Sequence, residues 1–233
     1  MADPQQPETD GINQYAESAL HLALKRWVAR PGDRFELKVD GLVIDIVRDH
    51  QLIEVQTGNF SALKRKLVRL LDAHPVHVVY PVAQRRWLVT LDSGGKAQRR
   101  RQSPKKGEVG QIFSELVYMP DLLAHPGLTL EVLLIEDEEI RVDDGQGSWR
   151  RRGVSIRDRR LLAVLHSERF DTPADLLRLL PPDLPATFTT ADLSGGVRKR
   201  QRLAQQTAYC LKHLGLITEV GRRGRAILYA FPS

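Results

Sequence analysis

Three strand-like segments joined by two tight turns constrain the fold of this sequence more than any other feature. Strands are predicted at residues 34–41, 42–47 and 52–57, where apolar residues alternate or run together. Asp40–Gly41 is a pair typical of a two-residue hairpin, and the tetrapeptide RDHQ makes the second connection. Strands joined by such short turns pair side by side and antiparallel, so this stretch predicts a three-stranded meander.

Helices are predicted on both sides of the meander. Apolar residues recur at helical spacing in residues 13–29, and the sequence RPGD ends that helix. Residues 60–73 form a second amphipathic segment, and strands are predicted at 74–82 and 85–92. A strand–helix–strand crossover is normally parallel and right-handed. The N-terminal half therefore predicts an α/β or α+β domain with a mixed sheet.

The middle of the chain is less regular, and the pattern changes at residue 157. Residues 94–111 are predicted to be a mobile basic loop, followed by a helix near 112–123, a strand at 128–135 and an acidic turn. Helices are then predicted at 157–170, 172–181 and 189–195, with a long helix from Arg198 to Gly215 and a final hairpin with GRRG at its tip. Thr172 and Pro173 suit the start of a helix. The predicted organisation is a disordered leader at 1–12, one domain at 13–152 and a second at 153–233.

Two carboxylates interrupt apolar strands of the meander. Asp45 and Glu54 lie nine residues apart, which places them side by side if the chain turns near Asp49. A buried charge is costly unless it is paired or binds a cation. Together with a main-chain carbonyl, most plausibly that of Val55, the two acids offer the hard oxygen ligands that Mg²⁺ or Mn²⁺ prefers. In the alternative interpretation both acids lie on a solvent-facing side and pair with Arg48 or Lys38.

The order of elements around these acids resembles the PD-(D/E)XK nuclease superfamily over residues 13–82. In that superfamily a helix, three strands, a helix and a strand carry a Glu on the first helix, an Asp on one strand and Glu-X-Lys on the next. The matching positions here are Glu17, Asp45 and the sequence EVQ at Glu54–Gln56. The resemblance implies a restriction-endonuclease-like fold and metal-dependent hydrolysis of DNA, with Glu17, Asp45, Glu54 and Gln56 as catalytic residues and Asp45, Glu54 and Val55 at the metal.

Gln56 departs from the superfamily pattern. The lysine expected there is thought to activate the attacking water, and a neutral glutamine cannot supply its charge. Lys64 or Lys66 on the following helix is the candidate substitute. The departure also keeps open a second function, that of a DNA-binding regulator with a degenerate nuclease fold.

The uneven charge predicts a polyanionic partner, and DNA is the partner that the resemblance implies. Residues 153–233 hold 13 Lys and Arg against 7 Asp and Glu, which equals the whole net charge of +6, and residues 84–106 hold eight basic residues and one acid. The helix–helix–long helix–hairpin order at 157–233 resembles a winged helix-turn-helix domain, whose long helix and wing bind DNA. The predicted DNA-binding residues are Lys64, Lys66, Arg99, Arg100, Arg101, Lys105, Lys106, Arg198, Lys199, Arg200, Arg202, Arg222, Arg223 and Arg225. A third arginine run occupies positions 150–152. The alternatives are solvated charges and a winged helix that contacts only proteins.

Several classes of protein are excluded or disfavoured. The chain has no Walker-type or Rossmann motif, so no nucleotide cofactor is expected. The single cysteine, Cys210, cannot form an internal disulfide. No apolar run approaches the roughly 18–20 residues of a membrane span, and the polar start is unlike a signal peptide, so a cytoplasmic protein without membrane contact is expected. A homodimer is implied by the resemblance alone, and a protein–protein adaptor is the third possibility.

Overall fold

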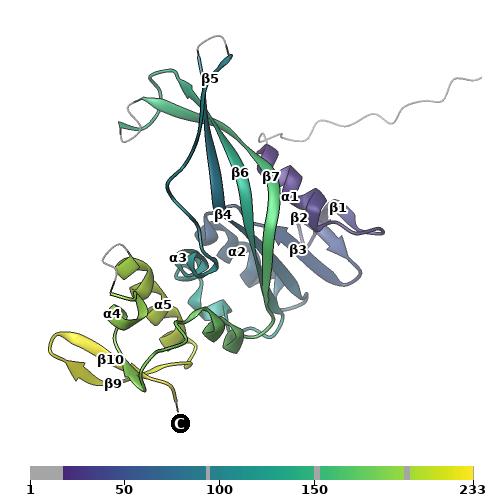
Figure 1. Ribbon diagram of the computed structural model, residues 1–233. Coiled ribbons are helices and arrows are strands. Elements are labelled where there is room, and N and C mark those ends of the chain that lie inside the picture. The colour runs from purple at the N-terminus through teal and green to yellow at the C-terminus, as the bar shows by residue number, and fades with distance from the viewer. Residues whose placement is uncertain (1–17, 93–94, 150–152, 197–199, 233) are drawn as a thin grey trace, which may run out of the picture.

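The computed structural model describes residues 18–92, 95–149, 153–196 and 200–232. It confirms a mixed α+β fold: a seven-stranded mixed sheet carries helices on both faces, and a three-stranded sheet lies in the C-terminal part (Figure 1). The predicted leader at 1–12 lies outside the described residues. Within the described part, no helix is long and apolar enough to cross a membrane.

The N-terminal half follows the predicted order. Its elements are α1 (Ala19–Val28), β1 (Arg34–Val39), β2 (Leu42–Arg48), β3 (Gln51–Val55), α2 (Phe60–Leu70) and β4 (Val76–Leu91). Asp40 and Gly41 both have positive φ, which fits the predicted two-residue turn between β1 and β2. Strands β1, β2 and β3 form the antiparallel meander, and β4 pairs with β3 in parallel after the α2 crossover. These predictions are confirmed.

The large sheet extends well past its predicted strands. Its order is β1-β2-β3-β4-β6-β7, with β5 (Ala97–Gln102) paired to β4. The two strands predicted at 74–82 and 85–92 are one continuous strand, β4, because β6 (Leu128–Asp143) pairs with it along its whole length. The predicted mobile loop at 94–111 contains β5, and the predicted acidic turn is the second half of β6.

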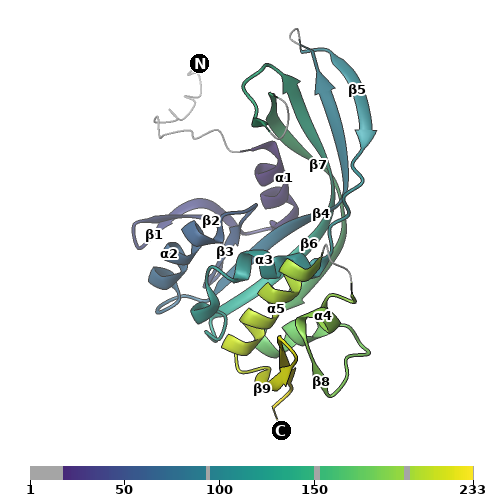
Figure 2. The same ribbon diagram turned by 90° about the vertical axis from the view of Figure 1, so that its left-hand side faces the viewer.

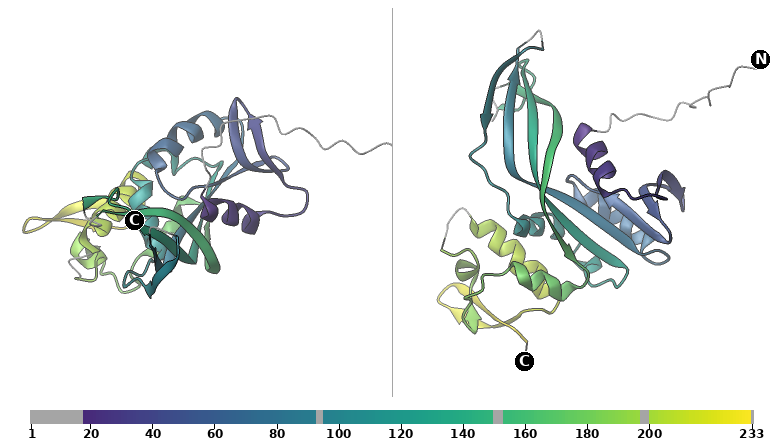
Figure 3. Two further views of the ribbon diagram at one scale, coloured as in Figure 1. Left: turned by 90° about the horizontal axis from the view of Figure 1, so that it is seen from above. Right: turned by 45° about the vertical axis from the view of Figure 1, so that its right-hand side comes forward.

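The outer halves of these strands form an arm. In Figures 1 and 3, β4, β5, β6 and β7 (Val154–Phe170) project together beyond the helices that cover the rest of the sheet. The helix predicted at 157–170 is wrong, because this segment is β7 and pairs antiparallel with β6. The predicted domain boundary at 152/153 therefore falls between two strands of one sheet.

Short helices replace two of the longer predicted ones. The helix near 112–123 is divided into η1 (Val109–Ile112), α3 (Phe113–Leu116) and η2 (Pro120–Leu122). The segment 172–181 is the 3₁₀ helix η4 (Pro173–Leu179). Its start is as predicted: Pro173 is at the first helical position, and the Asp175 carboxylate accepts hydrogen bonds from the Thr172 amide and hydroxyl.

The C-terminal part contains the predicted long helix and hairpin. Its remaining elements are β8 (Thr187–Phe188), α4 (Thr190–Leu193), α5 (Gln201–His213), β9 (Thr218–Arg223) and β10 (Ala226–Ala230). Helix α5 ends before Gly215, whose φ of 69° is in the left-handed region that glycine adopts most easily. Strand β10 lies between β8 and β9 in the small sheet.

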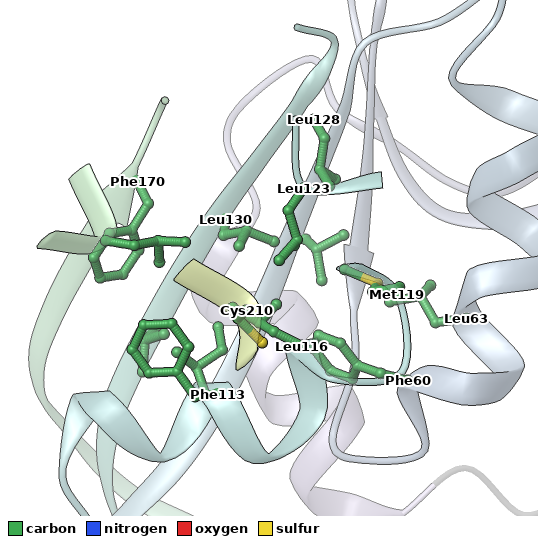
Figure 4. Close-up of a cluster of buried hydrophobic side chains, with 14 of the residues drawn as sticks. Phe60, Leu63, Phe113, Leu116, Met119, Leu123, Leu128, Leu130, Phe170 and Cys210 are labelled. Atoms are coloured by element: carbon green, nitrogen blue, oxygen red, sulfur yellow. The ribbon is translucent and has the colours of Figure 1, made fainter. Parts of the chain in front are cut away.

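Two apolar clusters cover the two faces of the large sheet. Leu20 and Leu24 of α1 pack on one face, whereas α2 covers the other through residues that include Phe60 and Leu63. The second cluster continues through α3 into α5, where Cys210 lies among Phe113, Leu116 and Met119 (Figure 4). The C-terminal part therefore shares one core with the α2 face of the sheet.

Candidate functional site

The predicted carboxylate pair forms where β2 and β3 separate. Their pairing ends at Ile46 and Ile53, and extending that register by one residue sets Asp45 opposite Glu54. Beyond that point the Val55 amide donates to Asp45 Oδ2 at 2.8 Å instead of continuing the ladder, and β3 pairs with β4 through Val55 and Val79. Asp45 and Glu54 therefore lie at the point where the two strands diverge.

Asp45 is held as a carboxylate by helix α1. Its side chain is 14% exposed, its Oδ2 lies 3.1 Å from His21 Nε2, and its Oδ1 lies 3.9 Å from Lys25 Nζ. Burial alone would raise the pKa of Asp45, but the hydrogen bonds from His21 and Val55 and the charge of Lys25 lower it overall. Asp45 is therefore ionised at neutral pH.

Glu54 is in the opposite electrostatic situation. Its side chain is 5% exposed, and Lys66 Nζ of α2 lies 2.6 Å from its Oε1. That contact is close enough for an ion pair, but Oε1 accepts no hydrogen bond of regular geometry and is buried. Burial and the charge of Asp45 raise the pKa of Glu54 to about 7, although Lys66 lowers it in part. Two adjacent carboxyl groups with pKa values displaced in opposite directions are typical of sites that bind cations or transfer protons.

The solvent-facing alternative is wrong. The Glu54 carboxyl group is buried, the Asp45 side chain is only 14% exposed, and Arg48 pairs with Asp33 at 2.7 Å. The alternative interpretation required exposed cations to pair with both acids. Each acid instead contacts a lysine from a different helix. The arrangement separates Asp45, which faces α1, from Glu54, which faces α2.

Of the two candidate lysines, only Lys66 reaches the carboxylates. Lys66 also donates to the Val43 carbonyl, so its ammonium group lies between β2 and Glu54. Lys64 instead pairs with Asp121 at 3.1 Å. The Gln56 amide donates to the Gly58 carbonyl, which holds this side chain in the turn after β3.

Two carboxylates with space for water would suit Mg²⁺, which commonly binds one or two acids and keeps several waters. Among residues 18–92, 95–149, 153–196 and 200–232, no group of three or more His, Cys, Asp or Glu side chains is arranged to hold a metal ion. Glu17, the third predicted acid, lies outside the described residues. The buried Glu54 Oε1 without a regular donor is the atom that a cation would satisfy.

The sequence prediction missed three site residues. His21 and Lys25 lie one helical turn apart on α1 and both approach Asp45, and Lys25 also contacts Glu36. Their i, i+4 spacing puts them on one face of the helix, beside the buried Leu24. Polar residues on the apolar face of a helix were the signal available in the sequence. Glu36 gave no such signal in the sequence. Its contact with Lys25 depends on the local backbone, in which Glu36 has a φ of 53°.

The predicted DNA-binding residues occupy three separate places. The first place is α2, which carries Lys64 and Lys66. The second is the edge strand β5, which carries Arg99, Arg100 and Arg101 and is followed by Lys105 and Lys106. The third is the C-terminal part, which carries Arg200, Arg202, Arg222, Arg223 and Arg225. Arg198, Lys199 and the arginine run at 150–152 lie outside the described residues. Most of the described ones are exposed, as phosphate contacts require.

Among these arginines, Arg100 and Arg200 donate hydrogen bonds to acids within the protein. The guanidinium of Arg100 stacks 4.0 Å from the centre of the Trp87 ring and donates to Glu138 at 2.9 Å. Arg200 pairs with Glu108 at 2.7 Å. Arg99 and Arg101 point to the other side of β5, because side chains alternate along a strand. Arg100 therefore stabilises the arm, and its two neighbours are the better candidates for DNA contacts.

The fold and this site define a mixed α+β protein with a carboxylate pair, one member of which is buried, between two lysine-bearing helices. A domain of unknown function, DUF8091, matches residues 18–171, so the chain belongs to that family. A relative from Treponema pallidum (strain Nichols), described as "Uncharacterized protein", is 38% identical over 222 residues, which cover 94% of this chain and 86% of the relative. No solved structure matches the chain. The family match ends one residue after β7, at the edge of the large sheet.

Proposed function

We propose that the protein is a metal-dependent DNA endonuclease of the PD-(D/E)XK type. The observation that carries this proposal is the position of Lys66, whose ammonium group lies 2.6 Å from Glu54 at the end of β3. A cation from α2 at this position supplies the charge that Gln56 lacks. The confirmed order α1-β1-β2-β3-α2-β4 agrees with the nuclease resemblance and supports the proposal.

The proposed roles follow from the chemistry of each group. Asp45 and Glu54 would hold Mg²⁺ or Mn²⁺ with the Val55 carbonyl and Glu17. When bound, the metal supplies a water of lowered pKa and neutralises charge on the phosphate. Lys66 would stabilise negative charge on the scissile phosphate, and His21 and Lys25 position the Asp45 carboxylate through the contacts described above.

The C-terminal part would bind the DNA as a winged helix does. The amino-terminal end of α5 carries Arg200 and Arg202, and the β9–β10 hairpin carries Arg222, Arg223 and Arg225. Charged groups on a helix end and on a hairpin tip suit the major groove and the phosphate backbone, respectively. Within the described part of the chain, Arg223 is the hairpin arginine that approaches an acid, Asp192, at 3.7 Å.

A DNA-binding regulator without nuclease activity is the second candidate. Gln56 favours it, because its amide is bound to the Gly58 carbonyl rather than directed at the acids. In that case the Lys66–Glu54 contact would serve only to neutralise a buried carboxylate. The two candidates differ in one measurable property, which is cleavage that requires a metal.

The test is a cleavage assay on supercoiled plasmid, linear duplex and branched DNA, with Mg²⁺, Mn²⁺ or a chelator. Nicking that requires metal and disappears in Asp45→Ala supports the endonuclease. Lys66→Gln should also lose cleavage. Arg65→Gln is the matched control, because this residue is adjacent to Lys66 on α2 but is exposed, and its loss should leave cleavage within about twofold. Salt-sensitive DNA binding without cleavage of any substrate would favour the regulator.

A further inference from the structure

A trough lies between α3 and α5, near the base of the arm. Figure 2 shows these two helices side by side. Two adjoining hollows, of about 740 and 550 Å³, are lined by residues of α3 and α5 or next to them, and η4 and α4 also line the smaller one. The larger hollow is lined by residues that include Lys105, Lys106, Ser114, Tyr118, Arg202 and Gln206. Both hollows share Glu108, Arg200 and Leu203, so they form one continuous feature.

The larger hollow has an excess of positive charge. Lys105, Lys106 and Arg202 make no ion pair within the described part of the chain, whereas Arg200 is neutralised by Glu108. The other acid in the lining, Glu115, accepts a hydrogen bond from the Phe60 amide at 3.2 Å and so is held at the amino-terminal end of α2. Three cations are therefore available to an anion that enters the hollow.

An exposed aromatic ring stands among these cations. Tyr118 follows α3, is 51% exposed and contributes to the lining of the larger hollow beside Lys105, Lys106 and Arg202. Further along α5, Tyr209 is 49% exposed and packs against the His213 ring, with 6.3 Å between the ring centres. Tyr209 lies outside the two hollows, so Tyr118 is the exposed ring of the trough, and a positively charged groove that carries an exposed aromatic ring suits single-stranded nucleic acids.

We propose that this trough binds an unpaired stretch of DNA, with a base stacked on Tyr118 and phosphates on Lys105, Lys106 and Arg202. A hollow of about 740 Å³ lies within the range of about 300–1,000 Å³ of ordinary ligand sites, so it accepts roughly one or two nucleotides. In a duplex the bases are stacked on one another, and Tyr118 would have no free base to contact. The proposal rests on the proposed function, in which DNA is the substrate. It restricts that substrate to duplexes that carry an unpaired strand.

Helix α2 connects the trough to the carboxylate site. Its first residue, Phe60, is bound by Glu115 of the trough, and its Lys66 contacts Glu54. Lys64, between them, is linked through Asp121 to His213 at the end of α5. A strand held in the trough would therefore lie on the same side of the sheet as Glu54.

The test is a binding measurement on the full chain with a chelator present, so that no substrate is cleaved. Fluorescence anisotropy would compare a short oligothymidine, a fully paired hairpin duplex and inorganic polyphosphate. Tyr118→Ala should weaken oligothymidine binding about tenfold and leave duplex and polyphosphate binding unchanged, whereas Tyr118→Phe should bind like the unaltered protein. Arg202→Ala should weaken oligothymidine binding and reduce its salt dependence.

Lys212→Ala is the matched control, because this α5 lysine lies outside the trough and pairs with Glu219. Unchanged oligothymidine binding in Tyr118→Ala would overturn the proposal. An equal loss of affinity for oligothymidine and for duplex in Tyr118→Ala would also overturn it, as would a loss of oligothymidine affinity in Tyr118→Phe equal to that in Tyr118→Ala. The outcome is independent of catalysis. Failure of the endonuclease proposal appears only as absent metal-dependent cleavage, and it leaves the difference between single-strand and duplex binding intact.

Discussion

At the scale of single residues, Asp45 and Glu54 are neighbours whose surroundings favour different protonation states. Asp45 receives hydrogen bonds from His21 and Val55, whereas Glu54 is buried beside the Asp45 charge and has one close cation, Lys66. A second negative charge at this point is unfavourable until a cation is added. The pair is consequently arranged so that metal binding would release a proton from Glu54 near neutral pH.

Glu54 should make the protein less stable as pH rises. Its pKa in the folded state is about 7, above the ordinary value of 4.5, so the folded protein keeps a proton that the unfolded chain releases. The free energy of unfolding should fall as pH rises from about 4.5 to about 7 and then stay low. Without metal, Glu54→Gln should therefore be more stable than the unaltered protein by about 2 kcal/mol at about pH 8.

Urea unfolding with a chelator present, between about pH 5 and about pH 8, measures this effect. Asp183→Asn, which changes an exposed carboxylate, is the control and should give a difference that does not vary with pH. The compared quantity is the difference in the free energy of unfolding between Glu54→Gln and the unaltered protein. If this difference were also constant over the pH range, the folded protein would hold Glu54 ionised. The raised pKa would then be wrong.

The charge supplied by Lys66 should be transferable to position 56. Residue 56 directly follows β3, two positions after Glu54, and its amide still donates to the Val79 carbonyl of β4 at 2.8 Å, so a side chain at this position starts near Glu54. The double variant Gln56→Lys/Lys66→Gln should recover cleavage that Lys66→Gln alone has lost, to within about tenfold of the unaltered rate. Plasmid nicking at saturating metal measures the recovery. A double variant as inactive as Lys66→Gln would show that Lys66 acts through its position and not through its charge.

At the scale of elements, local sequence patterns predicted the parts that local interactions determine. The β1–β3 meander follows from alternation and from turn residues such as Asp40–Gly41, and the pairing of Asp45 with Glu54 follows from strand register. The segment 157–170 has many good helix formers, yet it is β7. Its conformation depends on β6, which offers a long open edge and acids such as Glu139 to pair with Arg159 at 3.4 Å. Such long-range pairing is not visible in a local pattern.

The same limit applies to the candidate site. The acids were found because they interrupt apolar strands, whereas the approach of His21, Lys25 and Lys66 depends on how α1 and α2 pack on the sheet. The sequence alone cannot tell which of Lys64 and Lys66 reaches Glu54, since both residues lie on α2. Packing turns Lys66 toward Glu54 and Lys64 toward Asp121.

The arm should depend on one buried ion pair. Arg86 donates from Nε and Nη2 to the Asp137 carboxylate, at 2.8 and 2.6 Å, and the Asp137 side chain is fully buried. Arg86→Met leaves that charge without its main partner, so the free energy of unfolding should fall by about 3 kcal/mol. Urea unfolding followed by circular dichroism measures the loss.

Arg85→Met is the matched control for this prediction. Arg85 is adjacent and half-exposed, and it pairs with Glu136 at 3.2 Å, so its loss should cost less than about 1 kcal/mol. The double variant Arg86→Met/Asp137→Leu should recover most of the lost stability, because Glu139, the other acid that Arg86 contacts, keeps Arg141 at 2.7 Å and Arg159 at 3.4 Å. A double variant no more stable than Arg86→Met would mean that Arg86 acts through its packing and not through Asp137.

At the scale of the whole molecule, the C-terminal part and the large sheet share a core. Cys210 and Leu211 of α5 are fully buried in the cluster that contains Phe113, Leu116 and the α2 face of the sheet. The family match ends at residue 171, yet the apolar packing continues past it. A shared core of this kind couples the unfolding of both parts.

Leu211→Ala tests this coupling, because the three tryptophans of the chain, Trp27, Trp87 and Trp149, all precede the C-terminal part. The substitution removes a fully buried side chain from α5 and should cost about 2–5 kcal/mol. If the two parts unfold together, tryptophan fluorescence should report the whole loss in a single transition that coincides with the one seen by circular dichroism. Lys212→Ala, at the adjacent exposed position on α5, should shift neither signal by more than about 0.5 kcal/mol. A fluorescence transition unchanged by Leu211→Ala would show that the large sheet unfolds independently, and that the packing of α5 against α3 contributes no cooperativity.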